Sequence, residues 1–119
     1  MRDTTITKVD STLSPRGNLG QRQLASGAWV ALRLWENERP GSRNAEYTQR
    51  EYEVVGYVLS GLAKLEIDGQ SALLAPGDSW VVPEGALHRY EILETFSALE
   101  ATSPPARVYD RREQPARHH

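Results

Sequence analysis

Short alternating runs of hydrophobic and polar residues, separated by turn residues, make up most of this 119-residue chain. Between Ala28 and Trp35 every second residue falls on one apolar face, and this period of two predicts a β-strand. The dipeptide Asp68-Gly69 favours the positive backbone angles of a two-residue hairpin turn. Further strands are predicted on the same grounds at residues 54–60, 62–67, 70–74, 80–82, 87–93 and 95–101.

Strands this short, at close spacing and with Gly and Pro between them, are typical of an antiparallel β-sandwich or barrel. No stretch has the period of an amphipathic helix of three turns. We therefore predict one all-β domain with an N-terminal arm over residues 1–26, a barrel over 27–110 and a tail over 111–119.

Composition excludes several classes of function. Lys and Arg total 14 against 16 Asp and Glu, and a net charge of -2 does not favour a nucleic-acid or membrane-surface partner. The apolar runs are too short to span a membrane, and the first residues lack the hydrophobic segment of a signal peptide, so we expect a cytoplasmic protein. The absence of cysteine excludes disulfides and thiolate chemistry. Of the three histidines, His118 and His119 end the chain and are given no role.

The segment from Gly77 to His88 fits the pattern G-x5-P-x-G-x2-H without a gap. It resembles the second motif of the cupin superfamily, and Tyr57-Val58-Leu59-Ser60-Gly61 resembles the end of the first. The resemblance covers about residues 28 to 110 and implies an antiparallel jelly-roll barrel of the RmlC-like type. It also implies that His88 opens a strand and points into the barrel mouth.

The first motif departs from the family pattern. Metal-binding cupins carry H-x-H-x3-E-x6-G there, and counting back from Gly61 puts Thr48, Arg50 and Val54 at the three ligand positions. A guanidinium repels a divalent cation and valine offers no donor atom, so we expect no cofactor and no standard metal site. The alternative is a bulge that turns Glu53 inward beside His88, with Glu51 or Gln49, to hold a metal ion weakly.

Strand parity predicts which residues share the interior with His88. Tyr90 lies two positions on, so we assign His88 and Tyr90 as the catalytic candidates, an imidazole that titrates near neutral pH beside a phenol. A planar guanidinium suits a carboxylate or phosphate. The predicted ligand-binding residues are Arg50, Tyr57, Trp80 and Thr48. The structural alternatives are a His88 held by a backbone carbonyl, a Tyr90 that only forms wall, and an Arg50 in a solvated loop.

These residues predict a barrel that binds a small polar or anionic metabolite in its mouth without the three-histidine, one-carboxylate metal site. If the protein is an enzyme, the expected chemistry is proton transfer, as in isomerisation, epimerisation or dehydration. The alternatives are a metal-dependent enzyme that uses His88 and Glu53, and a non-catalytic sensor or scaffold.

A homodimer is also predicted. Trp29 and Trp35 lie on the strand face opposite Val30, Leu32 and Leu34, so if one set faces the core the other is exposed. The arm, with Ile6 and Val9, is a candidate for a strand exchanged with the partner copy.

Overall fold

The computed structural model of the protein describes residues 4–14, 20–41 and 46–106. Apart from one short 3-10 helix, its elements are strands, so the all-β prediction is confirmed. In chain order the elements are η1 (Ser11–Leu13), β1 (Arg22–Ser26), β2 (Ala31–Glu38), β3 (Glu53–Ile67), β4 (Gln70–Leu74), β5 (Ser79–Val82) and β6 (His88–Ser103).

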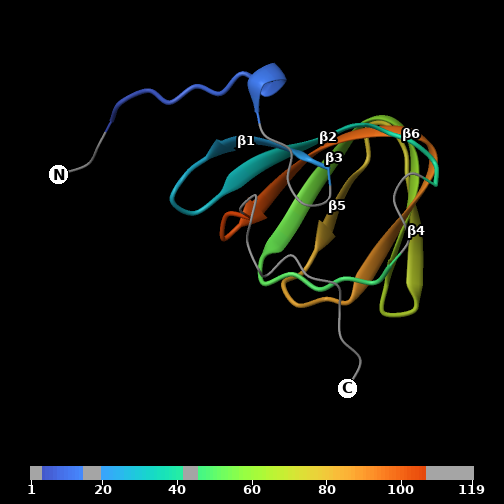
Figure 1. Cartoon of the computed structure of the whole chain (residues 1–119). Helices are drawn as coiled ribbons and strands as arrows, with labels where there is room; N and C mark the ends of the chain where they lie inside the picture. The colour runs from blue at the N-terminus through green and yellow to red at the C-terminus, as the bar shows by residue number, and fades with distance from the viewer. Residues whose placement is uncertain (1–3, 15–19, 42–45, 107–119) are drawn as a thin grey trace.

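Two long strands, β3 and β6, pair along their whole lengths and connect the two layers of the jelly roll (Figure 1). The strand order is β1-β2-β6-β3-β4, and β5 pairs with the first half of β3. The second half of β3 pairs instead with β4. The sequence pattern divides each long strand into two, because turn and polar residues interrupt the alternation at the points where the strands bend.

The bend in β3 depends on Gly61. This residue has a φ of 85°, in the region that favours glycine, and a Cβ added there would lie 2.7 Å from the Phe96 Cα atom. The pairing register between β3 and β6 shifts on both sides of Gly61. A side chain at this position would therefore separate the two strands where they fold from one layer into the other.

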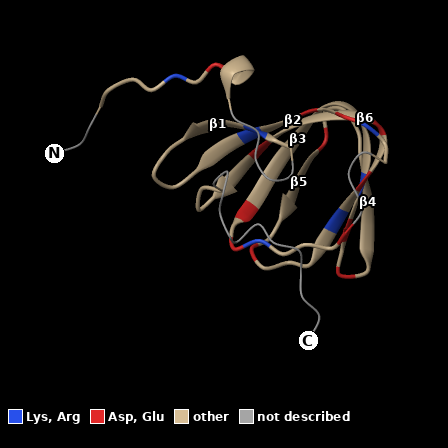
Figure 2. Ribbon diagram, viewed as in Figure 1, with Lys and Arg blue, Asp and Glu red and all other residues tan. Residues whose placement is uncertain are grey.

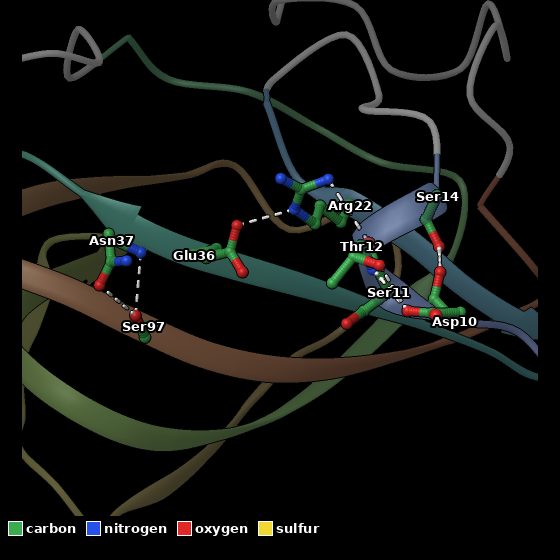
Figure 3. A network of polar contacts seen from close by, with 8 residues as sticks. All are labelled: Asp10, Ser11, Thr12, Ser14, Arg22, Glu36, Asn37 and Ser97. Carbon is green, nitrogen blue, oxygen red and sulfur yellow. Dashed lines mark hydrogen bonds and ion pairs between the residues drawn. The ribbon is translucent and has the colours of Figure 1, made fainter.

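The predicted boundaries differ from the structure at the N-terminal end. Residues 22–26, which the sequence assigns to the arm, form β1 and pair with β2. Residues 4–9 of the arm, which include Ile6 and Val9, form no strand and extend away from the barrel (Figure 1). Figure 3 shows how η1 is attached, because Arg22 donates to the Ser11 carbonyl at 3.4 Å and to Glu36 at 2.7 Å. The predicted tail over 111–119 lies outside the described residues.

The interior face of β2 is not the one that its apolar alternation suggests. Ala31, Arg33 and Trp35 are buried, whereas Val30 and Leu32 are exposed. Arg33 can lie inside because a buried carboxylate on β6 pairs with it, as described below. The core itself is aromatic and aliphatic, with fully buried Tyr52 and Phe96 packed among residues of β3 and β5.

The described part of the chain has a mixed distribution of charges and no membrane-spanning helix. Figure 2 shows Lys and Arg interspersed with Asp and Glu along the described strands and loops. Within residues 4–14, 20–41 and 46–106, no helix is long and apolar enough to cross a membrane.

Candidate functional site

The segment before β3 lies beside the start of β6. Thr48 and His88 form a two-way bridge, in which the Thr48 N–H donates to the His88 carbonyl at 2.8 Å and the reverse bond measures 3.0 Å. The Gly85 N–H donates to the Arg50 carbonyl at 2.8 Å. These backbone bonds bring the first-motif segment next to the turn that precedes His88. The even-numbered positions 48, 50 and 52 are the more buried ones, as parity predicts.

His88 is buried and its ring orientation is fixed. Its Nδ1 atom lies 2.9 Å from the Ala86 carbonyl oxygen, and since a carbonyl only accepts, Nδ1 donates and the lone pair is on Nε2. Burial lowers the pKa of the imidazole below its usual 6.5, and the nearby charge of Arg50 acts in the same direction. His88 is therefore a neutral hydrogen-bond acceptor at neutral pH. The backbone-carbonyl bond of the structural alternative is present and leaves Nε2 available.

Tyr90 packs against three aromatic rings. The Trp80 Nε1–H donates to the Tyr90 hydroxyl at 2.9 Å, and the Tyr90 ring lies edge-on to His88 and Trp35, at centroid distances of 5.6 and 5.0 Å. Burial raises the pKa of Tyr90 strongly, with a further contribution from the negative charge of Glu100. The phenol therefore stays protonated and can act as a hydrogen-bond donor.

A buried ion pair that the sequence did not predict lies on the same interior face. Arg33 Nε donates to Glu100 Oε1 at 2.6 Å, and Trp35 Nε1 donates to the same oxygen at 2.6 Å. Arg33 also donates to the Tyr52 hydroxyl at 3.0 Å. Alternation alone gives no signal for this pair, because Glu100 in the series Phe96, Ala98, Glu100, Thr102 and Arg33 on β2 are each isolated charges that would equally suit an outward face.

Arg50 is the unusual member of the site. It is only 5% exposed, its Nε atom is buried without a hydrogen-bond partner, and Nη1 reaches the Gln49 carbonyl only at 3.5 Å. Its charge lowers the pKa of both His88 and Tyr90, as expected of a cation in the same interior. The alternative that Arg50 lies in a solvated loop is therefore wrong.

Two predicted residues are not in the site. Tyr57 is 49% exposed on the outer face of β3, and Glu53 is exposed on that same face. The reason is parity, because Val54, Gly56 and Val58 face inward and their odd-numbered neighbours must face outward. No bulge turns Glu53 toward His88, and Glu51 and Gln49 are also exposed.

The donor set does not fit the metal site of the family. At the positions where metal-binding members carry two histidines and a glutamate, this chain has Thr48, a buried guanidinium at Arg50 and the inward side chain of Val54. No group of three or more His, Cys, Asp or Glu side chains that could hold a metal ion occurs among the described residues. The predicted alternative pair, His88 and Glu53, is not assembled.

Trp80 separates this interior from an open cavity. A cavity of about 610 Å³ lies between β4 and β5, and Trp80, Leu65 and Leu74 line its inner side. Trp80 packs over Gly56, where an added Cβ would lie 2.7 Å from the indole Cε2 atom and closer still to two other ring carbons. The indole therefore forms a wall that touches Tyr90 on one side and the cavity on the other.

Similarity to solved structures extends over most of the chain. An RmlC-like cupin from Shewanella frigidimarina is 18% identical with a TM-score of 0.71, covering 87% of this chain and 94% of that one. A structure of Streptomyces PAC13 with uridine gives 17% identity, a TM-score of 0.74 and coverage of 95% and 92%. KdgF from a Halomonas species is 24% identical with a TM-score of 0.63, covering 71% and 78%. At this identity these similarities show the fold.

Sequence comparison identifies the family. No curated protein matches the chain. The family model of the cupin domain matches residues 35–101, which is more than half of the chain and includes the motif that ends at His88. With this match and the jelly-roll topology of its strands, the chain belongs to the cupin family.

Proposed function

We propose that the protein binds a small anionic metabolite inside the barrel, without the metal site of its family, and that Arg50 holds the anionic group. The observation that carries the proposal is the buried guanidinium whose Nε has no partner. His88, Tyr90 and Thr48 line the same interior and supply neutral hydrogen-bonding groups.

A buried cation with an unpaired donor such as Arg50 Nε is costly. Leaving a buried polar group without a hydrogen bond costs about 1–3 kcal/mol, and more for a charged group. No acidic side chain among the described residues pairs with Arg50, although Arg33 on the same interior face has Glu100. A carboxylate or phosphate would accept from Nε in a charge-assisted bond and remove this cost. The geometry therefore favours an anion that the described residues do not supply.

Relatives of similar fold support a small polar ligand. The structure of Streptomyces PAC13 contains uridine, a small polar molecule, in a chain that this protein covers almost completely. The similarity is one of fold, and it is the chemistry of Arg50 that favours an anion here.

Ligand-dependent stabilisation tests the proposal. A panel of small carboxylates and phosphate monoesters is added to wild-type protein, and thermal unfolding is followed by circular dichroism; a ligand at 100 times its Kd stabilises by about 2.7 kcal/mol. We expect stabilisation in the wild type and in Arg89→Met, which removes an arginine from the surface pair with Glu66, but not in Arg50→Met. Equal stabilisation of Arg50→Met and the wild type would contradict the proposal.

A second candidate function, proton transfer, rests on the state of His88. A neutral imidazole with its lone pair on Nε2 can accept a proton and return it, beside a Tyr90 phenol that stays protonated. The test is exchange of carbon-bound hydrogens of the bound ligand in D2O, measured by proton NMR. His88→Gln should abolish this exchange while it leaves affinity within about twofold; undiminished exchange would exclude the role.

We also propose that the protein is a cytoplasmic homodimer, formed through a different surface from the strand face of Trp29 and Trp35 that the sequence predicted. Trp35 is buried, but over β2, β6, β3 and β5 the outer face of the sheet carries two cross-strand rows without a charged residue, and Val55 and Val81 in them are about half exposed. The rows are Leu32, Ala101, Val55, Val81 and Leu34, Leu99, Tyr57, Ser79.

A two-fold axis places such a face against itself, and an uncharged apolar surface is complementary to its own copy. The arm, with Ile6 91% exposed, extends away from its own barrel and is available to contact a partner. Sedimentation equilibrium should give a dimer for the wild type and for Leu73→Lys on β4, and a monomer for Val55→Lys. A monomeric wild type would refute the dimer.

A further inference from the structure

Beyond an anionic group for Arg50, we propose that the ligand carries a hydroxyl or amine that donates a hydrogen bond to Glu100 Oε2. This inference rests on the proposed function, because it adds a second contact point in the same interior. Glu100 is then a specificity-determining residue. It selects hydroxylated or amino-substituted acids and phosphates over simple ones.

Glu100 has one oxygen with two donors and one oxygen with none. Arg33 and Trp35 both donate to Oε1 at 2.6 Å, whereas Oε2 is buried and has no hydrogen-bond partner. The residue is 1% exposed, and its ion pair with Arg33 identifies it as a carboxylate. A buried carboxylate oxygen is a strong acceptor, and leaving it unpaired is costly. It therefore calls for a donor that the described residues do not supply.

The two unpartnered atoms belong to one continuous interior. Trp35, which donates to Glu100, packs on Tyr90, and Tyr90 packs on His88. His88 is bridged to Thr48, two residues before Arg50. In agreement with this geometry, the charges of Arg50 and Glu100 both act on the pKa of His88 and of Tyr90. A cation that needs an acceptor and an anion that needs a donor are thus connected through one set of packed interior side chains.

The charges also fix the direction of the ligand. Glu100 repels an anionic group, so the acid or phosphate end lies at Arg50 and the donor end at Glu100. The rings of Trp35 and Trp80 both pack edge-on against Tyr90 in this interior, and we infer that these aromatic side chains contact the carbon skeleton of the ligand. The structure thus describes an interior with two distinct polar ends.

The test uses four open-chain six-carbon probes on the wild-type protein. D-Gluconate has a carboxylate at one end and a hydroxyl on each of its remaining carbons. A hydroxyl donor is therefore available to Glu100 whatever the distance between Glu100 and Arg50. Hexanoate has only the carboxylate, sorbitol only hydroxyls, and sorbitol 6-phosphate replaces the carboxylate by a phosphate. Dissociation constants are measured by isothermal titration calorimetry at constant ionic strength. We expect gluconate or sorbitol 6-phosphate to bind at least about tenfold more tightly than hexanoate and sorbitol.

The other possible results distinguish a failure of the Glu100 contact from a failure of the anion site at Arg50. If hexanoate binds as tightly as gluconate, the role of Glu100 is refuted while the anion site at Arg50 stands. If sorbitol binds as tightly as the two anions, or none of the four probes binds, the proposed function fails and the inference with it. The stronger of the two anionic polyols identifies the acid group as a carboxylate or a phosphate.

A substitution assigns the effect to Glu100. In Glu100→Gln the side-chain oxygen can keep the Arg33 and Trp35 bonds, while an amide donor replaces the acceptor at the Oε2 position. Affinity for the preferred polyol anion should fall at least about tenfold and affinity for hexanoate should stay within about twofold. The matched control is Glu91→Gln, an exposed position on the same strand. Unchanged selectivity in Glu100→Gln would overturn the inference, and if this variant does not fold, the wild-type series decides alone.

Discussion

The contact between Gly56 and Trp80 can be tested by adding a single methyl group. In Gly56→Ala the new Cβ would lie 2.7 Å from Trp80 Cε2 and closer to Cζ2 and Cη2, so the indole must move. The three affected atoms belong to the six-membered ring of the indole. Moving that ring also breaks the bond from Trp80 Nε1 to the Tyr90 hydroxyl at 2.9 Å. The substitution therefore perturbs the wall of the site as well as the core.

The expected magnitude is the sum of three effects. Overpacking a well-packed core costs about 1–3 kcal/mol. Losing the Trp80–Tyr90 hydrogen bond costs about 0.5–1.5 kcal/mol. Replacing glycine by alanine gains about 0.4–1 kcal/mol, because it restricts the unfolded chain. We expect a net loss of about 2 kcal/mol in the free energy of unfolding, which is a decrease of about 1 M in the urea midpoint.

The assay is equilibrium urea unfolding followed by far-UV circular dichroism. The control is the same substitution in a Trp80→Phe background, where the phenyl ring does not extend to the position of the outer indole ring. There Gly56→Ala should cost less than half as much, which is a coupling of about 1 kcal/mol. An equal cost in both backgrounds, or an unchanged midpoint in the wild-type background, would refute the packing of Trp80 over Gly56.

Three further predictions concern charge, protonation and the bend. Arg33→Met leaves a buried Glu100 without its cation and should lower the free energy of unfolding by about 3 kcal/mol or more, as measured with urea. The double variant with Glu100→Leu should recover at least half of this loss. Additive losses from the two substitutions would argue against the ion pair. The folded-state pKa of His88 lies below its usual 6.5, so the unfolded chain binds the extra proton and stability should fall as pH decreases below about 6.5. His88→Gln should flatten this dependence in urea midpoints from pH 7.5 to 5, and an unchanged slope would contradict the assignment. Gly61→Ala should cost about 3 kcal/mol, from a φ of 85° and a Cβ 2.7 Å from the Phe96 Cα atom, and a loss below about 1 kcal/mol would show that the strands can separate there.

Much of the fold follows from local patterns. The alternation of the strands and the Asp68-Gly69 turn, whose φ values are 50° and 77°, agree with the sequence because both depend on residues close together in the chain. The continuity of β3 and β6 through their bends does not follow, since it is set by pairing between residues far apart. The inward face of β2 was also not predictable, because the apolar set Val30 and Leu32 lies outside and Arg33 is stabilised by Glu100, 67 positions away.

The candidate site was predictable where the motif fixes the register. His88, Tyr90 and Trp80 lie on the predicted side of β6 and β5, and Arg50 and Thr48, in the segment before β3, lie on the side that their parity with motif positions predicts. Tyr57 was chosen for its place in the motif, yet its odd position puts it outside. Glu100 was missed because an isolated acidic residue in a strand is indistinguishable from a solvent-facing one until its partner across the sheet is known.

A crystal structure of the protein with D-gluconate or sorbitol 6-phosphate bound would locate both polar groups of the ligand. We expect the acid group on Arg50 Nε and a hydroxyl on Glu100 Oε2, two of the three buried side-chain atoms without a hydrogen-bond partner among the described residues. A structure in which Arg50 Nε donates to a protein acceptor and the ligand lies outside the barrel would contradict it.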